Sequence, residues 1–205
     1  EDINPSIVSA TTAEVGLKVI VTDRLLRQNN ENVFSIIGRQ MGNAMARKKD
    51  TDAIALFSGL STALGGDGTA FSLAFASAAI AKAKANKFGS PLFIVHHPNA
   101  IFEFINDFTA GIATYGAIPK PFAADVLQDF YSGIKVSGVP FFEDGNIPKI
   151  STTDSAYGVI ANKNCLGYLV AKGKSEERDR DISLRAWEVV ITEDYTRFEV
   201  DDSLG

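Results

Sequence analysis

The sequence has little of what metal, redox and membrane proteins need. Cys165 is the only cysteine in 205 residues, which excludes an intramolecular disulfide and a cysteine-based zinc site. His96 and His97 are the only histidines. The longest apolar stretch, Leu73 to Ala81, is far shorter than the ~18 residues of a transmembrane helix.

Basic clusters are also scarce. The chain has 20 Lys and Arg against 25 Asp and Glu, for a formal net charge of −5. Its densest basic run, Arg47 to Lys49, is followed at once by Asp50 and Asp52. Tight non-specific binding to nucleic acid needs cations gathered on one face, so composition argues against it. With 45% hydrophobic and 22% charged residues, the chain is an ordinary globular protein rather than a disordered or fibrous one.

The first quarter of the chain predicts a strand and then a long helix. Apolar residues alternate from Ala13 to Val21, which is typical of a strand with one buried face. A lone strand is unstable, and we expect its partner among residues that precede Glu1. From about Glu31 to Phe57 the apolar spacing becomes helical, and Asn29, Asn30 or Asn32 can cap its start. Gly38 and Gly42 on one side of this helix would permit close backbone approach.

A turn-rich stretch, Ser58 to Thr69, is the best candidate for a domain junction. After it, the sequence predicts a helix over Leu73 to Asn86, capped by Ser72 or Thr69. Leu92 to Val95 then reads as a buried strand, and Pro98 begins a helix that reaches about Phe108. The middle of the chain therefore mixes helices and strands.

The second half is predicted to be richer in strands. Pro121 begins one more helix, after which Ser137 and Gly138 form the two-residue loop of a hairpin. The last fifty residues look β-rich, with roughly alternating polar and apolar residues near Trp187 to Ile191 and Tyr195 to Val200. Helices and strands do not alternate regularly, so the sequence favours an α+β fold over a doubly wound sheet.

Two motifs invite a chemical interpretation that does not hold. His96 and His97 would point to opposite faces of a strand, so they cannot easily share one metal ion. We interpret them as a strand-to-helix turn. Gly65 to Thr69 is rich in glycine, but a phosphate-binding loop needs a preceding strand and a Lys after its last Gly. We interpret this loop as a flexible junction.

Two further features lack the context of an active site. Cys165 lies between Asn164 and Leu166, and we expect a strand-to-helix turn there without the surroundings of a nucleophile. The run Glu176 to Asp181 interleaves acids with Arg178 and Arg180, which favours a solvated or intersubunit ion-pair strand over a metal site. No catalytic constellation assembles, so the sequence predicts no enzyme, cofactor or metal.

Several motifs taken in order resemble a known family. They are T-T-A-E-V-G-L-K-V-I-V-T-D, the long helix, A-L-F-S-G-L, G-G-D-G-T-A-F-S-L, P-L-F-I-V-H-H-P, G-I-K-V-S-G-V-P-F-F, A-Y-G-V-I-A-N-K-N and E-E-R-D-R-D-I-S-L-R-A. This succession resembles the major capsid proteins of tailed bacteriophages, with the fold named after phage Hong Kong ninety-seven. Each motif alone is weak, whereas the ordered set covers nearly the whole chain.

The resemblance implies a division of the chain into named parts. Residues 1–27 would be the return strand of an extended E-loop, and residues 28–57 the spine helix of the peripheral (P) domain. Residues 58–153 would form the axial (A) domain, and residues 154–205 the β-ribbon and closing strands of the P-domain. The N-terminal arm and first E-loop strand of the family are missing, so we expect the chain to start inside the protein.

The resemblance also implies a function. The chain would be a structural protein that self-assembles into hexamers and pentamers of an icosahedral shell around phage double-stranded DNA. Its partners would be copies of itself, with portal, scaffolding or decoration proteins besides, weak non-specific contact with DNA and no membrane. It would be assembled in the bacterial host cytoplasm and would reside in the virion. We expect assembly contacts at charged residues near the two ends of the chain: Glu14, Lys18, Asp23, Arg24, Arg178, Asp179 and Arg180.

Two alternatives stay open from the sequence. The same fold could form an encapsulin-like nanocompartment that encloses an enzyme instead of DNA. Alternatively, a small α+β enzyme could use Asp67, His96 or Cys165 in a site that the sequence does not reveal.

Overall fold

The computed structural model divides the chain into two compact units. Unit 1 comprises Glu1–Ala53 and Gly167–Phe198, and unit 2 comprises Ile54–Leu166 and Glu199–Gly205. The structure describes residues 8–28, 32–60, 62–66, 68–105, 135–149, 155–201 and 204–205. Helices and strands are mixed without regular alternation, which confirms the α+β class.

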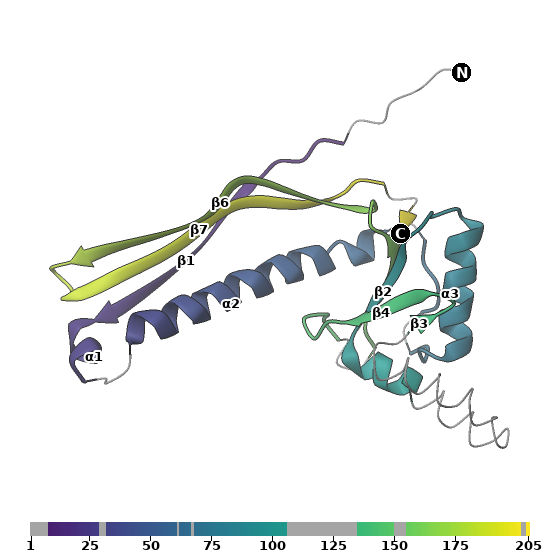
Figure 1. Ribbon diagram of the computed structural model, residues 1–205, viewed down its shortest axis with the longest axis horizontal. Coiled ribbons are helices and arrows are strands. Elements are labelled where there is room, and N and C mark those ends of the chain that lie inside the picture. The colour runs from purple at the N-terminus through teal and green to yellow at the C-terminus, as the bar shows by residue number, and fades with distance from the viewer. Residues whose placement is uncertain are drawn as a thin grey trace. The chain divides into compact units, whose positions relative to one another are not determined.

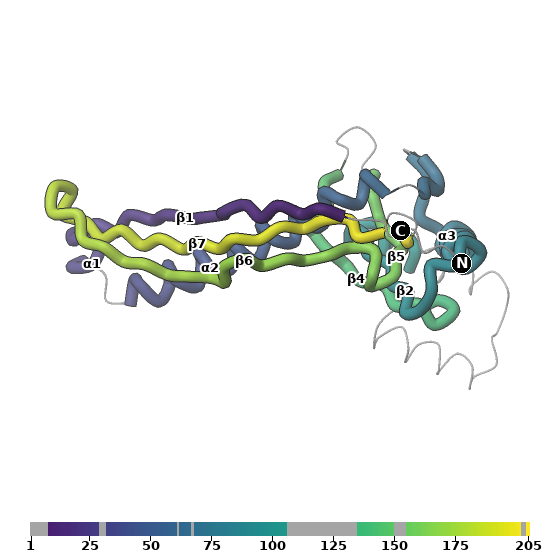
Figure 2. Tube along the Cα trace, turned by 90° about the horizontal axis from the view of Figure 1, so that it is seen from above, coloured from purple at the N-terminus to yellow at the C-terminus, as the bar shows by residue number. Residues whose placement is uncertain are grey.

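A three-stranded sheet forms one layer of unit 1. Its strands are β1 (Ala13–Thr22), β6 (Leu166–Asp181) and β7 (Ala186–Glu199), in the order β1-β7-β6 (Figure 1; Figure 2). The predicted alternating strand is confirmed as β1. It pairs antiparallel with β7, with Leu17 opposite Ile191. The expectation that its partner precedes Glu1 is therefore wrong, because the partner strand comes from the other end of the chain.

The second layer of unit 1 is the helix α2 (Val33–Ile54). Asn32 caps its start, because the Ser35 backbone N–H donates to Asn32 Oδ1 over 3.3 Å. The helix runs along one face of the sheet (Figure 1), where Met41 and Met45 pack with Val189 and Ile191. These four side chains are at most 5% exposed, so the interface between the two layers is the core of unit 1.

The close approach predicted at two helical glycines is wrong. A Cβ added at Gly38 would meet nothing within 4 Å, and one added at Gly42 would meet only Lys174 Nζ, at 3.7 Å. The larger side chains Met41 and Met45 hold this part of α2 on the sheet. The glycines thus lie at the margin of the contact between the layers.

Unit 2 contains a second sheet. Its strands are β2 (Leu92–His96), β3 (Lys135–Val136), β4 (Val139–Glu143) and β5 (Val159–Asn162), in the order β3-β4-β2-β5. β2 pairs parallel with β4 and antiparallel with β5. β3 and β4 form the predicted hairpin around Ser137 and Gly138, both of which have positive φ, as this tight turn requires.

Helices cover one of the two apolar faces of β2, the face that carries Leu92 and Ile94. α3 (Leu73–Ala85) buries Ala76, Ile80 and Ala83 in the cluster that receives Leu92 and Ile94. Residues 98–105 are also helical and add Ile101 and Phe104 to the same cluster. The start of α3 is confirmed, since Ser72 Oγ accepts from the Phe75 N–H over 3.2 Å.

The opposite side of β2 is covered by the chain's turns. Phe93 and Val95 pack in a cluster with Ala161 and Cys165, together with Phe57 of the short 3₁₀ helix η1 (Phe57–Gly59). Cys165 lies in the turn from β5 to β6, so the predicted strand-to-helix turn is wrong. The helix predicted from Pro121 lies outside the described residues.

Candidate functional site

All seven residues predicted at an assembly interface lie in unit 1. Glu14 and Lys18 belong to β1, Asp23 and Arg24 to α1 (Asp23–Gln28), and Arg178, Asp179 and Arg180 to the end of β6. The antiparallel sheet brings the end of β1 alongside the start of β7, directly after the β6–β7 turn. The structure therefore gathers the last five of these residues at one end of the sheet, while Glu14 and Lys18 lie farther along β1.

Polar contacts lock this end of the sheet. Asp181 Oδ1 accepts hydrogen bonds from Ser183 N–H at 2.8 Å, Ser183 Oγ at 2.6 Å and Leu184 N–H at 3.2 Å. These bonds, led by that of the Ser183 side chain, lower the pKa of Asp181. Arg180 pairs with Asp23 at 3.0 Å, and the Asp23 N–H donates to the Arg185 carbonyl over 3.0 Å. The turn and α1 are thus tied together.

The locked turn holds apolar side chains in solvent. Ile182 is 83% exposed and Leu184 is 57% exposed, and Leu25 of α1 is 45% exposed. We call Leu25, Ile182 and Leu184 the apolar tip. A rigid turn that presents large apolar side chains is a preorganised contact surface, because burying them in a partner costs little further ordering.

Two of the predicted arginines stack on aromatic rings. The Arg178 guanidinium lies 5.7 Å from the centroid of the Phe34 ring, and that of Arg180 lies 5.6 Å from the centroid of Trp187. The two rings meet edge to face at 6.2 Å. The Arg178 contact attaches β6 to α2, and the Arg180 contact attaches β6 to β7, so the two arginines stabilise the subunit itself.

Of the other predicted residues, some pair within the subunit and some are exposed. Lys18 pairs with Glu188 across β1 and β7 at 2.7 Å. Glu14 and Arg24 are exposed, and the side chain of Asp179 accepts from the Arg180 N–H over 2.7 Å. Among the predicted residues, Lys18 thus pairs within the sheet, whereas the side chains of Glu14 and Arg24 are exposed.

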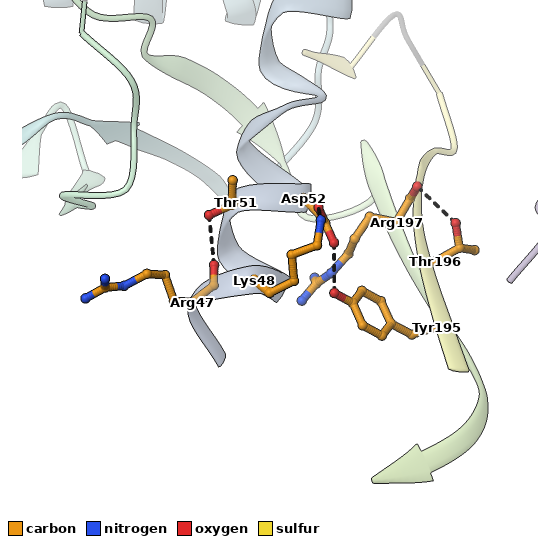
Figure 3. A network of polar contacts seen from close by, with 7 residues as sticks. All are labelled: Arg47, Lys48, Thr51, Asp52, Tyr195, Thr196 and Arg197. Atoms are coloured by element: carbon orange, nitrogen blue, oxygen red, sulfur yellow. Dashed lines mark hydrogen bonds and ion pairs between the residues drawn. The ribbon is translucent and has the colours of Figure 1, made fainter. Parts of the chain in front are cut away.

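Sequence analysis missed a partly buried polar cluster between α2 and the sheet. Lys49 Nζ lies 2.7 Å from Glu193 Oε1, which also accepts from the Tyr168 hydroxyl over 3.1 Å. The Tyr195 hydroxyl donates to Asp52 over 2.8 Å (Figure 3). We call Lys49, Asp52, Tyr168, Glu193 and Tyr195 the polar clamp. Alternation of apolar residues could not reveal it, since Glu193 occupies a core position of β7.

The clamp shifts the ionisation of its members. The hydrogen bond to Glu193 raises the pKa of Lys49, so its ammonium stays protonated at neutral pH. Burial, and then the hydrogen bond to Asp52, raise the pKa of Tyr195. A protonated Lys49 is not a nucleophile. The cluster is therefore suited to holding α2 on the sheet rather than to catalysis.

His96 is buried in an aromatic environment. Its ring centroid lies 4.8 Å from that of Phe71, and Nδ1 accepts from the His97 N–H over 2.8 Å. Burial, with a smaller contribution from His97, lowers the pKa of His96 to about 4. The ring is neutral at pH 7 and serves as a packed aromatic group.

Acidification should weaken unit 2 through His96. Its folded pKa is depressed from 6.5 to about 4, so the stabilising effect is complete above pH 6.5 and is lost as the pH falls toward 4. We expect a loss of about 2 kcal/mol between pH 7 and pH 5 from this group. Urea unfolding followed by circular dichroism should show a shallower pH dependence in His96→Phe. An identical slope in the variant would contradict this assignment.

The remaining candidates do not converge on a reaction centre. No group of three or more His, Cys, Asp or Glu side chains in the described part of the chain could hold a metal ion. A cavity of about 340 Å³ in unit 2 is bordered mainly by apolar side chains, among them Phe71 and Phe75, with His96 in its wall. Cys165 is fully buried in the cluster of Phe93 and Val95, and Asp67 lies outside the described residues. None of the helices within the described ranges is long and apolar enough to cross a membrane.

Comparison with known proteins identifies a family. The family model described as phage capsid protein matches residues 6–202. No curated protein sequence matches the chain.

Solved structures share the fold at low sequence identity. A chain from Mycobacterium phage Che8 superposes with a TM-score of 0.73 at 19% identity. The match covers 93% of the present chain and 68% of the Che8 chain. The capsid of cyanophage P-SCSP1u gives 0.62 at 15% identity, with coverages of 98% and 76%. The SrpI encapsulin of Synechococcus elongatus PCC 7942 gives 0.65 at 13% identity, with coverages of 94% and 71%. The likeness to capsid structures confirms the fold that the ordered motifs predicted.

Proposed function

The chain belongs to the phage capsid protein family, and we propose that its copies assemble into the hexamers and pentamers of an icosahedral shell around double-stranded DNA. The observation that carries this proposal is the family match, which spans residues 6–202 and thus includes both units. As a capsid protein it is a structural component of the virion. We propose the bacterial host cytoplasm as the place of its assembly.

The proposed roles of the chain's parts follow the family's organisation. Residues 1–27 act as the E-loop return strand, and residues 28–57 contain the spine helix. Residues 58–153 form the A-domain, and residues 154–205 complete the P-domain. The long α2 supports the assignment of the spine helix, and the β6–β7 ribbon supports the assignment of residues 154–205 to the P-domain.

The proposed assembly contacts lie on unit 1. Arg24 and Asp179 offer exposed charges beside the apolar tip, and Glu14 offers one farther along β1. Contacts within the chain shape the rest of this surface. They are the ion pairs of Lys18 and Asp23 and the ring contacts of Arg178 and Arg180. A second copy of the chain is the proposed partner at this surface. Portal, scaffolding or decoration proteins are further proposed partners of the finished shell.

The direct test is the size of what the purified full chain forms. We expect capsomers or megadalton particles in analytical ultracentrifugation, with closed shells in electron micrographs. Sedimentation as a monomer under every assembly condition would contradict the proposal.

The apolar tip should be needed for particle formation. Burying Ile182 and Leu184 in a neighbour would contribute about 2 kcal/mol each per contact, so Ile182→Asp/Leu184→Asp should stop assembly beyond the smallest oligomer. The fluorescence of Trp187 should stay unchanged, because both side chains are exposed within the subunit. The matched control Ile182→Val/Leu184→Ile keeps the tip apolar and should form particles. Normal particles from the Asp variant would exclude this contact.

The likeness to the SrpI encapsulin supports a second candidate with the same fold. An encapsulin-like shell would copurify with an enclosed protein. A phage capsid would contain nuclease-protected DNA instead. Mass spectrometry and nuclease treatment of one particle preparation separate the two.

A further inference from the structure

The cavity in unit 2 is large enough to hold a small organic molecule. Its volume of about 340 Å³ lies within the range of roughly 300 to 1,000 Å³ that is usual for ligand pockets. Every residue that borders it belongs to unit 2. The polar clamp and the apolar tip belong to unit 1, so the cavity contains no residue of the proposed assembly surface.

Aromatic and aliphatic side chains make most of the cavity wall. Phe75 and Ala79 come from α3, Ile94 comes from β2, and Phe71 and Phe88 come from the segments that flank α3. The Phe71 and Phe75 rings meet edge to face with their centroids 6.0 Å apart. Water finds few hydrogen-bond partners in such a space, so an apolar ring gains affinity by displacing it.

The turn-rich stretch from Ser58 to Thr69 borders one side of the cavity. Lys82 Nζ of α3 donates to the carbonyl of Ala63 in this stretch over 3.0 Å. A Cβ at Gly65, where φ is +81°, would lie 2.7 Å from the Phe75 ring. The stretch is therefore held directly against the cavity wall, and the ammonium group of Lys82 at the rim already has an acceptor.

His96 contributes a polar atom to the same wall. The residue is 9% exposed, and its Nδ1 accepts from the His97 N–H over 2.8 Å, so in the neutral ring Nε2 carries the proton. In the ranges that the structure describes, Nε2 has no hydrogen-bond partner. It lies 2.9 Å from the position of a Cβ at Gly158, which also borders the cavity. Because Gly158 has no side chain, the Nε2–H group is left open toward the cavity.

We propose that this cavity binds an uncharged aromatic molecule with one hydrogen-bond acceptor, such as an aromatic ketone, whose oxygen accepts from His96 Nε2. The site goes beyond the proposed capsid function and does not depend on it. An acceptor is favoured because a buried N–H without a partner costs free energy that the ligand oxygen would recover. A charged ligand is disfavoured because the apolar wall would remove water from its charge, while Lys82 already donates to Ala63.

Two probes of nearly the same shape test this assignment. In para-fluoroacetophenone a carbonyl oxygen can accept from His96, whereas para-fluorocumene has a methyl group in place of that oxygen. Titration of the full chain, followed by fluorine NMR of the probes, measures both dissociation constants, which we expect at or below about 1 mM. His96→Phe keeps an aromatic ring but removes the donor. It should weaken binding of the ketone at least about fivefold and change that of para-fluorocumene by less than about twofold.

A second pair of variants locates the probes. Ala79→Leu places a larger apolar side chain at the cavity wall and should weaken both probes at least about fivefold, because it occupies their space. The matched control Ala78→Leu adds the same side chain at an exposed position of α3 that does not border the cavity, and should leave both affinities within about twofold. Circular dichroism verifies that each variant is folded.

Other outcomes would overturn the inference. They include the absence of saturable binding of either probe, and equal losses in Ala79→Leu and Ala78→Leu. An equal loss of both probes in His96→Phe would show that His96 contributes packing and is not the donor. If both probes bind the unassembled chain but not particles, a neighbouring copy fills the cavity and the small-molecule assignment is wrong. The capsid function is tested separately by particle formation, so none of these results decides it.

Discussion

Lys49→Met should lower the free energy of unfolding of unit 1 by about 3 kcal/mol, because it leaves a buried carboxylate without its cation. The Glu193 side chain is only 5% exposed, and its Oε2 already has no hydrogen-bond partner within the described part of the structure. After the substitution, the Tyr168 hydroxyl would be the one remaining donor of the polar clamp to Glu193. Methionine keeps most of the apolar stem of lysine, so the loss reports the charge.

Urea unfolding of the unassembled protein, followed by Trp187 fluorescence, measures this effect. Trp187 is the only tryptophan and lies on β7, so it reports unit 1. The neighbouring variant Lys48→Met is the matched control. It removes an exposed pair with Asp52 and should cost less than about 1 kcal/mol.

A second variant separates the ion pair from simple packing. Lys49→Met/Glu193→Met replaces both charges by apolar groups and should recover most of the stability that Lys49→Met loses. A double variant as unstable as the sum of its two single variants would show that the pair contributes no coupling. A loss below about 0.5 kcal/mol for Lys49→Met alone would contradict the burial argument.

Gly158→Ala should destabilise unit 2 by about 3 kcal/mol, because the added methyl group has no room. Its Cβ would lie 2.1 Å from Cδ2 of His96. The ring of His96 cannot move away easily, since it packs on Phe71 and accepts the His97 N–H. Thermal unfolding monitored by circular dichroism should show a midpoint several degrees lower.

Two controls make this prediction specific. Gly145→Ala adds the same methyl group where nothing lies within 4 Å, and should change stability by less than about 0.5 kcal/mol. In a His96→Ala background the ring is gone, so Gly158→Ala should cost little further. An undiminished cost in that background would show that contact with His96 is not the cause.

The elements predicted well from sequence are those with a local signal. Alternation of Val15, Leu17 and Val19 identified β1, and helical spacing of Met41 and Met45 identified α2. Ser72 was one of the two residues expected to cap α3, and Ser137 and Gly138 were recognised as a hairpin loop. In each case the deciding interactions lie within a few residues, so the sequence carries them directly.

Elements without a local apolar pattern were predicted only in outline. β6 is one continuous strand from Leu166 to Asp181, but its second half alternates acids with bases and carries no hydrophobic periodicity. The segment was expected to be an ion-pair strand, and the side of the sheet that each charge faces became clear only from contacts such as Arg178 on Phe34. The polar clamp escaped notice because its partners are far apart in the sequence, with Lys49 and Glu193 separated by 144 positions.

The sequence by itself determined the fold class, because the spacing of apolar residues indicates an irregular mixture of strands and helices that is typical of an α+β protein. It also showed no evident reaction centre, since cysteine, histidine and long apolar runs are scarce. The resemblance to capsid proteins could also be recognised from the sequence, because the chain contains the ordered set of short motifs. Only the tertiary structure decided that β1 pairs with β7 and that Lys49 neutralises Glu193. Those facts depend on residues that meet only after the chain has folded, and no local periodicity encodes which distant segment will be the partner.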